Sequence, residues 1–326
     1  MDSTIQITVI LCTYNRARSL ASAVESVAVQ TLPQSVDWEI LVVDNNSSDQ
    51  TRQVVEDLRQ RHPDRIRYLL EPRQGVSHAR NAGIQEARGD ILAFIDDDET
   101  AGSGWLQNLT SSLHNGDWAG AGGRVVPQWR CSRPRWLSSQ NSFLSGPLAA
   151  FDVGPEGELI EPPFGANMAF RKDIFERYGG FRTDLGRVGK SLLSSEDTEF
   201  GRRLIAAGER LRWEPSAITY HPVEEDRVRK EYFQEWWFNK GRSDIRELGI
   251  QPKCKRFLGI PLRLLRDTAV EVARWTVSFE ASQRFICWLK VWAYAGEAYE
   301  AYHQSRDAKR KRREGNGSIG SSRVSE

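Results

Sequence analysis

Residues 75–99 read GVSHARNAGIQEARGDILAFIDDDE, and this stretch decides the fold. Its first part, residues 77–87, has helical character, and Gly89 closes the predicted helix. Residues 90–95 are almost continuously apolar, which predicts a buried strand. That strand leads directly into three adjacent aspartates, residues 96–98. A helix that passes through a short loop into a buried strand is the repeating unit of an α/β fold.

The same alternation of helix and strand extends back to the N-terminus. We predict strands at residues 5–12 (IQITVILC), 38–43 (WEILVV) and 66–70, and helices at residues 18–30 and around Val54, Val55 and Leu58. Strands that alternate with helices at this spacing form a parallel sheet with helices on both faces. The sequence therefore predicts an α/β fold with a mostly parallel, Rossmann-like sheet.

Polar clusters follow the predicted strands at residues 13–15, 44–46 and 96–98. In an open parallel sheet, ligands bind outside the carboxyl ends of the strands. We therefore expect these clusters, which are distant in sequence, to meet at one edge of the sheet. Asp44 has a second interpretation, as the N-cap of the helix that follows, although Asn45, Ser47 or Ser48 could supply that cap instead.

The acidic triplet suggests a cation site. Two unit charges about 4 Å apart repel by about 1 kcal/mol in water and about 4 kcal/mol at an effective dielectric of 20. Three carboxylates at the end of an apolar strand therefore favour a bound cation, and oxygen ligands suit Mg²⁺ or Mn²⁺. A strand places successive side chains on opposite faces, so we expect Asp96 and Asp98 to project together and Asp97 away. The alternative is an acidic turn exposed to solvent.

The rest of the chain divides by composition. Residues 118–165 are rich in Gly, Pro and Trp and predict loops and irregular strands over the site. We predict helices at residues 170–178 and 196–207 and a strand at residues 211–220. We expect an α/β domain over residues 1–225 with halves 1–100 and 101–225, an aromatic-rich helical extension over residues 226–305, and a basic, then Gly/Ser-rich, disordered tail over residues 306–326.

The charge pattern argues against some partners. A net charge of +1 is not that of a dedicated nucleic-acid binder. Four scattered cysteines, and a sequence with neither a signal peptide nor a long uncharged apolar run, predict a reduced, cytoplasmic location. Residues 306–313 (RDAKRKRR) carry six basic groups and one acid. With the aromatic helices before them they are either ordinary packing and a solvated tail, or a peripheral contact with anionic lipid at the inner face of the membrane, at about 1 kcal/mol per basic residue.

Six motifs, in this order and spacing, resemble family 2 glycosyltransferases with the GT-A fold. The nucleotide-binding half is carried by residues 7–20 (ITVILCTYNRARSL), 39–51 (EILVVDNNSSDQT) and 75–99. The acceptor half is carried by residues 163–181 (PFGANMAFRKDIFERYGGF), 194–204 (SSEDTEFGRRL) and 218–222 (ITYHP). The resemblance covers roughly residues 5–222 and implies that residues 1–100 bind the nucleotide and residues 101–225 the acceptor.

The resemblance also implies roles for individual residues of the nucleotide-binding half. Asp44 would hydrogen-bond the base, Asp96 would contact ribose or sugar hydroxyls, and Asp98 would bind the metal, with the share of Asp97 left open. The other implied nucleotide-sugar contacts are Thr13, Tyr14, Arg16, Asn45, Gly75, Arg80 and Asn81. Arg80 could instead be a solvated helix residue, and Gly75 a turn glycine.

In the acceptor half, the resemblance assigns the general base to Asp197, with Glu196 orienting the acceptor or another side chain. Both acids could instead complement the positive end of a helix dipole, which is worth about 0.3–1 kcal/mol. His221 would be a further metal ligand, or simply polar surface. The segment that meets donor sugar and acceptor contains Gly165, Asn167 and Met168, whose alternative roles are a tight turn and core packing.

The resemblance thus implies an inverting, metal-assisted glycosyltransferase. The donor would be a nucleotide-sugar, with UDP favoured, and the acceptor a carbohydrate or lipid-linked glycan in cell-surface polysaccharide or glycoconjugate synthesis. A sugar nucleotidyltransferase is the alternative enzyme, but no Gly-rich phosphate loop with a lysine follows the first strand. A non-catalytic nucleotide-sugar-binding module would not need all four acids Asp44, Asp96, Asp98 and Asp197.

Overall fold

The computed structural model describes residues 5–114, 116–137, 141–251 and 254–320. The chain divides into two compact units, residues 1–229 and residues 230–326. In the described part of the first unit, a nine-stranded sheet has the strand order β3-β2-β1-β4-β8-β6-β9-β5, and β7 pairs with β9.

One half of this sheet is parallel and matches the predicted alternation. Its strands are β1 (Ile7–Thr13), β2 (Trp38–Asp44), β3 (Ile66–Leu70) and β4 (Ile91–Asp96). The connecting helices are α1 (Ala17–Ala28), α2 (Thr51–Arg61) and α3 (Val76–Glu86). All pairings among these strands are parallel, so the predicted fold class is confirmed for this half.

Helices cover both faces of the sheet because the strands are apolar on both sides. Val9 and Leu11 pack in one cluster with α1, α2 and α4 (Trp105–Thr110), whereas Ile10 packs in the other. That second cluster contains α3, α6 (Lys172–Tyr178) and α7 (Glu196–Ala206). Successive side chains of a strand point to opposite faces, which explains why continuous apolar runs are needed here.

The second half of the sheet begins with β8 (Asn167–Arg171), which pairs antiparallel with β4. Its other strands are β5 (Thr100–Ala101), β6 (Gly120–Trp129), β7 (Gly157–Glu158) and β9 (Leu211–Val223), with short helices α5 (Ser142–Ser145), η1 (Ser111–Leu113), η2 (Gly146–Leu148) and η3 (Glu225–Val228). The helix predicted over residues 170–178 begins only at Lys172, because Phe170 and Arg171 pair with β4. The region expected to be irregular contains β6, a ten-residue strand.

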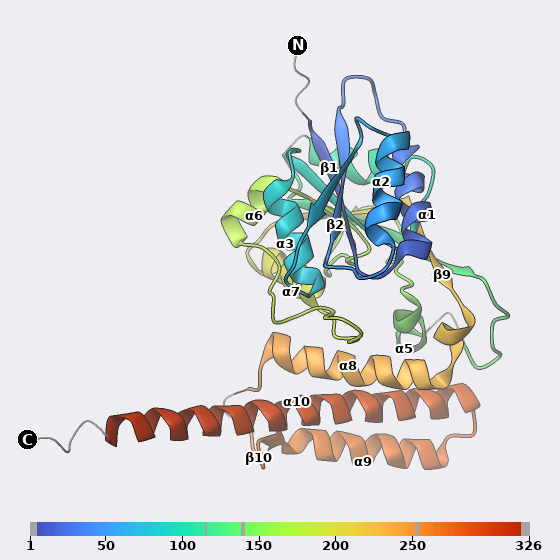
Figure 1. Ribbon diagram of the computed structural model, residues 1–326. Helices are drawn as coiled ribbons and strands as arrows, with labels where there is room; N and C mark the ends of the chain where they lie inside the picture. Colours follow the sequence, from blue (N-terminus) through green and yellow to red (C-terminus); the bar gives the residue numbers. More distant parts are fainter. Residues whose placement is uncertain (1–4, 115, 138–140, 252–253, 321–326) are drawn as a thin grey trace, which may run out of the picture. The chain divides into compact units, whose positions relative to one another are not determined.

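The second unit is helical. It consists of α8 (Lys230–Leu248), α9 (Leu262–Val277) and α10 (Ala281–Gly320), with a small hairpin of β10 (Arg256–Phe257) and β11 (Ile260–Pro261). Within this unit, α10 lies between α8 and α9 and packs against both (Figure 1). A Cβ atom on Gly241 would strike the Ala293 carbonyl, and one on Gly296 the Phe238 carbonyl, so these glycines let α8 and α10 approach closely.

The structure bears on two sequence predictions about this unit, the disordered tail and the absence of a membrane-spanning helix. Helix α10 continues to Gly320, past the point where the composition predicts a disordered tail; residues 321–326 lie outside the described residues. Within the described ranges, no helix has both the length and the hydropathy of a membrane span.

Candidate active site

The carboxyl ends of three parallel strands meet at one edge of the sheet, as the sequence predicts. Thr13, the last residue of β1, lies opposite Asp44, the last residue of β2. On the other side of β1, Cys12 lies opposite Asp96, the last residue of β4. Because β1 lies between β2 and β4, the three polar clusters share this edge. The register of the sheet, rather than proximity in sequence, brings them together.

The loops after β1 and β2 are joined by hydrogen bonds. Asn15, which has a left-handed φ of 52°, accepts a 2.8 Å hydrogen bond from the Ser48 backbone N–H through its side-chain oxygen. The backbone N–H of Asn15 donates to the Ser47 hydroxyl at 2.9 Å. Asp49 accepts hydrogen bonds from the backbone N–H of Thr51 at 3.0 Å and of Ala17 at 3.1 Å. Asp49 thus accepts hydrogen bonds from backbone N–H groups at the starts of both α1 and α2, which have no partner within their helices.

Asp44 therefore does not cap the helix after β2. The alternative caps Asn45, Ser47 and Ser48 do not cap it either. The Asp44 carboxylate accepts a 2.9 Å hydrogen bond from the Ser47 backbone N–H and another, also 2.9 Å, from the Tyr68 hydroxyl. Burial and the bond to Asp44 raise the pKa of Tyr68 to about 12, so Tyr68 remains a donor. Each Asp44 oxygen keeps further acceptor capacity, although the side chain is buried.

Asn45 and Gly75 shape the loop that leads into α3. The Asn45 amide nitrogen donates to the carbonyls of Glu71 and Arg73 at 3.1 and 2.7 Å, and its oxygen accepts from the Gly75 N–H at 2.7 Å. Both ends of the Asn45 amide are thus used within the protein. Gly75 has a φ of 136°, which side-chain-bearing residues rarely adopt, so its conformation requires glycine.

The acidic triplet does not keep the alternation of a strand. Strand β4 ends at Asp96, and Asp97 and Asp98 lie in the following turn. The Asp96 side chain is 45% exposed, whereas that of Asp98 is 10% exposed. The strand alternation that predicts a shared direction for these two side chains therefore does not reach Asp98, because β4 ends at Asp96. Burial and the charge of Asp98 raise the pKa of Asp97 to about 7. Asp97 is thus a buried member of the triplet, and the alternation rule had set it aside.

Asp98 is surrounded by basic groups. The guanidinium groups of Arg16 and Arg227 contact the same Asp98 oxygen at 2.6 and 3.3 Å, and the His221 ring nitrogen Nε2 lies 3.9 Å from it. Burial raises the pKa of Asp98, but His221, Arg16 and Arg227 outweigh that effect and bring the pKa down to about 2. Asp98 is therefore an anion at neutral pH.

His221 is buried in β9, so the alternative of a surface histidine is wrong. Burial and the charge of Arg227 lower its pKa to about 4, and its Nδ1 atom has no hydrogen-bond partner within the described structure. A carboxylate beside a neutral imidazole fits a divalent cation. The described side chains gather no set of three His, Cys, Asp or Glu residues that would hold an ion alone. The donor set therefore fits a cation that a ligand helps to bind.

Arg80 joins the nucleotide-binding half to the acceptor half. It is buried, and its guanidinium donates to Glu196 at 2.6 Å, to the Gly165 carbonyl at 3.2 Å and to Asp96 at 3.4 Å. The face of the Phe181 ring lies 5.5 Å from the same guanidinium. The alternative of a solvated helix residue is wrong for Arg80. Glu196 orients this arginine.

Asp197 lies beside that junction, in the first turn of α7. One of its oxygens accepts a 2.6 Å hydrogen bond from the Gly165 N–H, and the other a 2.7 Å bond from the Thr198 N–H. A Cβ atom on Gly165 would lie 2.7 Å from the Asp197 oxygen and 2.9 Å from the Arg80 nitrogen. Only glycine therefore fits between the two side chains. Ser195, just before α7, has a left-handed φ of 77°, a conformation often found at functional sites.

Three residues assigned to substrate contacts are used inside the protein instead. Asn167 is fully buried, where it accepts from the Trp105 indole and donates to the carbonyls of residues 124 and 217. Met168 is fully buried in the core, so its packing alternative is correct. The Asn81 amide bonds both backbone groups of Phe181. The prediction that Asn167 and Met168 meet the sugar is therefore wrong for their side chains.

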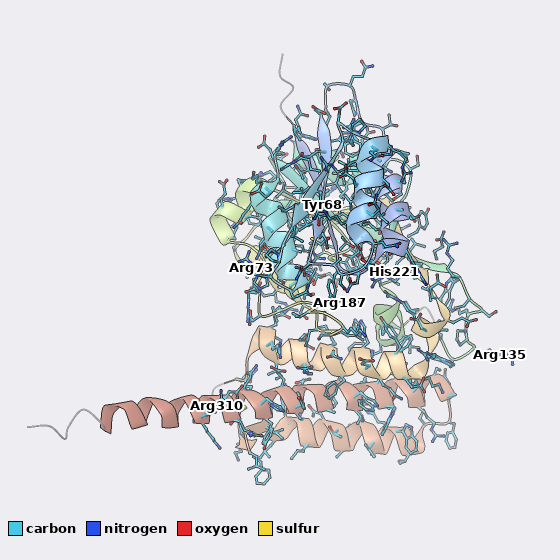
Figure 2. The ribbon with its side chains drawn as sticks, viewed as in Figure 1. Tyr68, Arg73, Arg135, Arg187, His221 and Arg310 are labelled. Atoms are coloured by element: carbon cyan, nitrogen blue, oxygen red, sulfur yellow. The ribbon has the colours of Figure 1, made fainter. Side chains whose placement is uncertain are left out.

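Three other residues at this edge belong to none of the sequence motifs. Tyr68 comes from β3 and Arg187 from the loop before α7 (Figure 2). Arg227 comes from η3. Arg187 adds positive charge near Asp96, Asp98 and His221. Tyr14 is half-buried in the loop after β1.

Comparison with known proteins identifies the family of the chain. Residues 8–179 match the family model described as Glycosyl transferase family 2. The chain is 31% identical over 248 residues to "Succinoglycan biosynthesis protein ExoM" of Rhizobium meliloti, which covers 76% of each chain. It is 29% identical over 240 residues to "Glucosyl-dolichyl phosphate glucuronosyltransferase" of Haloferax volcanii, covering 72% of this chain and 75% of that protein.

A solved structure supports the same fold. The mannosyltransferase PcManGT from Pyrobaculum calidifontis, in complex with GDP-Man and Mn²⁺, superposes with a TM-score of 0.61 at 19% identity. The superposition covers 91% of this chain and 86% of that one. At this identity the similarity establishes the GT-A fold alone. The GDP-Man and Mn²⁺ are ligands of PcManGT.

Proposed function

Because the chain belongs to glycosyl transferase family 2, we propose that it transfers a sugar from a UDP-sugar to a hydroxyl group of a carbohydrate or lipid-linked acceptor. Family membership removes the alternatives of a sugar nucleotidyltransferase and of a non-catalytic binding module. It also makes the protein an enzyme of polysaccharide or glycoconjugate biosynthesis. One relative is named for succinoglycan and another for a dolichyl phosphate substrate, and these names support a glycan acceptor that a lipid carries.

The observation that carries the proposal is the Arg80 junction. A single buried guanidinium contacts Asp96 of the triplet, the Gly165 carbonyl and Glu196, the neighbour of Asp197. A donor bound at the triplet and an acceptor bound beside Asp197 would thus lie on either side of one fixed group. Holding two reactants in this way removes much of the entropic barrier to their reaction.

Asp197 is the general base in this proposal. The N–H groups of Gly165 and Thr198 fix the orientation of its carboxylate and leave lone pairs on both oxygens. The acceptor hydroxyl would give its proton to Asp197 as its oxygen bonds to the anomeric carbon. The bond from that carbon to the donor diphosphate breaks on the opposite side, so the anomeric configuration inverts. A positioned base of this kind contributes about 10²–10⁴ in rate.

Asp98 and His221 would hold a divalent cation, Mn²⁺ or Mg²⁺, with Asp96 nearby and the donor diphosphate completing the ligand set. When bound, the cation offsets the negative charge that develops on the departing diphosphate. Arg16 and Arg227 already flank Asp98 and would contact the diphosphate as well. Asp44 accepts a hydrogen bond from the imide N–H of the base in this arrangement, oriented by Ser47 and Tyr68.

A nucleotide panel tests the donor and the metal. Thermal unfolding is followed with UDP, dTDP and GDP, each with Mn²⁺, with Mg²⁺ and with EDTA. We expect UDP with a divalent cation to raise the midpoint most, because ligands that bind only the folded state stabilise it. A larger shift with GDP, or an equal shift in EDTA, would contradict the donor or the metal. With an active donor and acceptor, a product of retained anomeric configuration by NMR would contradict Asp197 as the base.

A further inference from the structure

Helix α9 presents an apolar face to solvent. It packs on α10 through Leu264 and Glu271, which are both buried. On its opposite side lie Leu262, Leu265 and Val272, all exposed, with Ala269, Ala273 and Thr276 between them. Positions three and four apart fall on one side of a helix, so these residues form a continuous stripe. A surface helix normally has polar residues on that side, and α9 reverses the pattern.

Further apolar side chains are exposed at both ends of the helix. Val277, the last residue of α9, is exposed, and Phe279 in the turn between α9 and α10 is fully exposed, at 103%. Phe257 and Leu258 precede α9 in the β10–β11 hairpin and are also exposed. Exposed large apolar side chains gathered over one helix and its flanking turns indicate an interaction site.

The charges on α9 indicate what covers the stripe. Arg263, Arg266 and Arg274 are at least half exposed. Each of these arginines also pairs with an acid, Arg263 with Glu297, Arg266 with Asp267 and Arg274 with the buried Glu271. The helix itself has three arginines against two acids and so keeps an excess of one positive charge. The outward face thus combines apolar side chains with arginines. A second copy of the helix would set arginine against arginine, whereas an anionic lipid surface attracts the arginines and takes up the apolar side chains.

A groove beside the stripe is lined by aromatic and basic groups. It has a volume of about 630 Å³ between α8, α9 and α10. Arg284 lies over the Trp275 ring at 4.4 Å, and Lys230 over the Phe285 ring at 5.3 Å. All four of these side chains line the groove, as does Trp288. Cations on an aromatic wall suit an anionic head group whose acyl chain lies against the rings, because tryptophan and arginine both combine an apolar body with a polar end.

We propose that α9 and its flanking turns dock this protein on an anionic lipid bilayer. The stripe enters the boundary between head groups and acyl chains, and Lys230 and Arg284 contact a lipid phosphate. The inference stands independently of the proposed donor, metal and base, since it rests on the second unit alone. Its relation to the proposed function is that a lipid-linked acceptor is presented at such a surface.

Vesicle flotation with the full chain tests the proposal, without any substrate. The vesicles are phosphatidylcholine alone, or phosphatidylcholine with phosphatidylglycerol. We expect binding to the anionic vesicles and a marked loss at high salt. Leu265→Ser and Phe279→Ser should each weaken binding about tenfold, because each removes one apolar anchor. Arg266→Gln with Arg284→Gln should weaken binding to the anionic vesicles and leave the binding to neutral ones unchanged.

Leu248→Ser is the matched control. Leu248 is 67% exposed at the end of α8, Leu265 is 56% exposed, and Leu248 lies outside the stripe. Circular dichroism checks that each variant is folded, which exposed positions should allow. Equal binding of Leu265→Ser and Leu248→Ser, or no flotation of the wild-type chain, would overturn the proposal. A wild-type dimer that Phe279→Ser converts to a monomer, with vesicle binding unchanged, would overturn it in favour of self-association. None of these outcomes depends on catalysis, so they are separate from failure of the proposed function.

Discussion

Replacing Arg80 with methionine tests the junction on which the proposed site depends. The substitution keeps a long side chain but removes the guanidinium that Glu196 contacts at 2.6 Å. The two side chains are only 5% and 9% exposed, so solvent does little to screen the charge that is left behind. Removing one partner of a buried ion pair typically costs about 3–5 kcal/mol. We expect a loss of stability in that range above neutral pH.

The loss should depend on pH, with a sign that follows from Glu196. Burial and the charge of Asp197 raise its pKa to about 7, against the opposing effect of Arg80, so in Arg80→Met the pKa is higher still. Above pH 7 the wild-type carboxyl is ionised, whereas the folded variant retains a proton that its unfolded chain releases. The variant therefore loses stability relative to the wild type by about 1.4 kcal/mol per pH unit until its own pKa is reached. Below pH 7 Glu196 is protonated in both folded proteins, so the difference in stability no longer changes with pH and is at its smallest.

Urea unfolding of the wild type, Arg80→Met and Arg80→Met/Glu196→Gln measures this effect at several pH values. The double variant should regain much of the stability and lose the added pH dependence, because the buried charge is gone. It should remain inactive, because Asp96 and the Gly165 carbonyl still lack their donor. Arg59→Met is the control, since Arg59 and its partner Glu56 are 46% and 52% exposed, and exposed pairs contribute about 0–1 kcal/mol.

Two results would refute this reasoning. A loss in Arg80→Met no larger than in Arg59→Met would mean that the guanidinium does not stabilise a buried carboxylate. A pH-independent loss that Glu196→Gln does not relieve would mean that methionine disturbs packing near Phe181 rather than charge.

Further predictions concern the base, the cation and the glycine between them. Asp197→Asn should lower kcat by about 10²–10⁴ with UDP binding unchanged, measured by steady-state kinetics and calorimetry; a small kcat effect would remove Asp197 as the base. Asp98→Ala should abolish the Mn²⁺-dependent part of UDP binding in calorimetry, whereas metal-independent binding at wild-type strength would contradict the cation site. Gly165→Ala should displace Asp197, because the added Cβ would lie 2.7 Å from its carboxylate, and so lower kcat more than it raises KM. Tyr68→Phe removes the donor to one oxygen of buried Asp44, whose other oxygen keeps the Ser47 N–H, and should cost about 1–3 kcal/mol of stability, measured by urea unfolding.

The parallel half of the sheet could be predicted because its signals are local. Each strand is an apolar run that turn chemistry interrupts, and the α/β topology then fixes which strand ends meet. The register of Thr13 with Asp44 and of Cys12 with Asp96 follows from that topology. Local signals fail where a strand ends and the sequence does not mark its end. Strand alternation does not extend past Asp96, because β4 ends there and Asp97 and Asp98 belong to a turn.

Partners distant in sequence account for the other differences. On its own helix Arg80 has no feature that separates it from a solvated arginine, and it is buried because Glu196 arrives 116 residues later. The same holds for Tyr68, whose hydroxyl finds Asp44 across the β2–β3 pairing. Neither contact follows from composition, because each depends on which side of a packed element faces the sheet edge.

The segment around Gly165 shows how one motif can serve two purposes. The backbone of Gly165 belongs to the site, since its N–H holds Asp197 and its carbonyl holds Arg80. Two residues later the chain enters β8, where Asn167 pairs with Ile95 of β4 and its side chain faces the core. The motif therefore constrains backbone position at Gly165 and packing at Asn167. A polar residue of this motif is therefore not necessarily a substrate contact. The fold needs Asn167 in order to hold Gly165 in place.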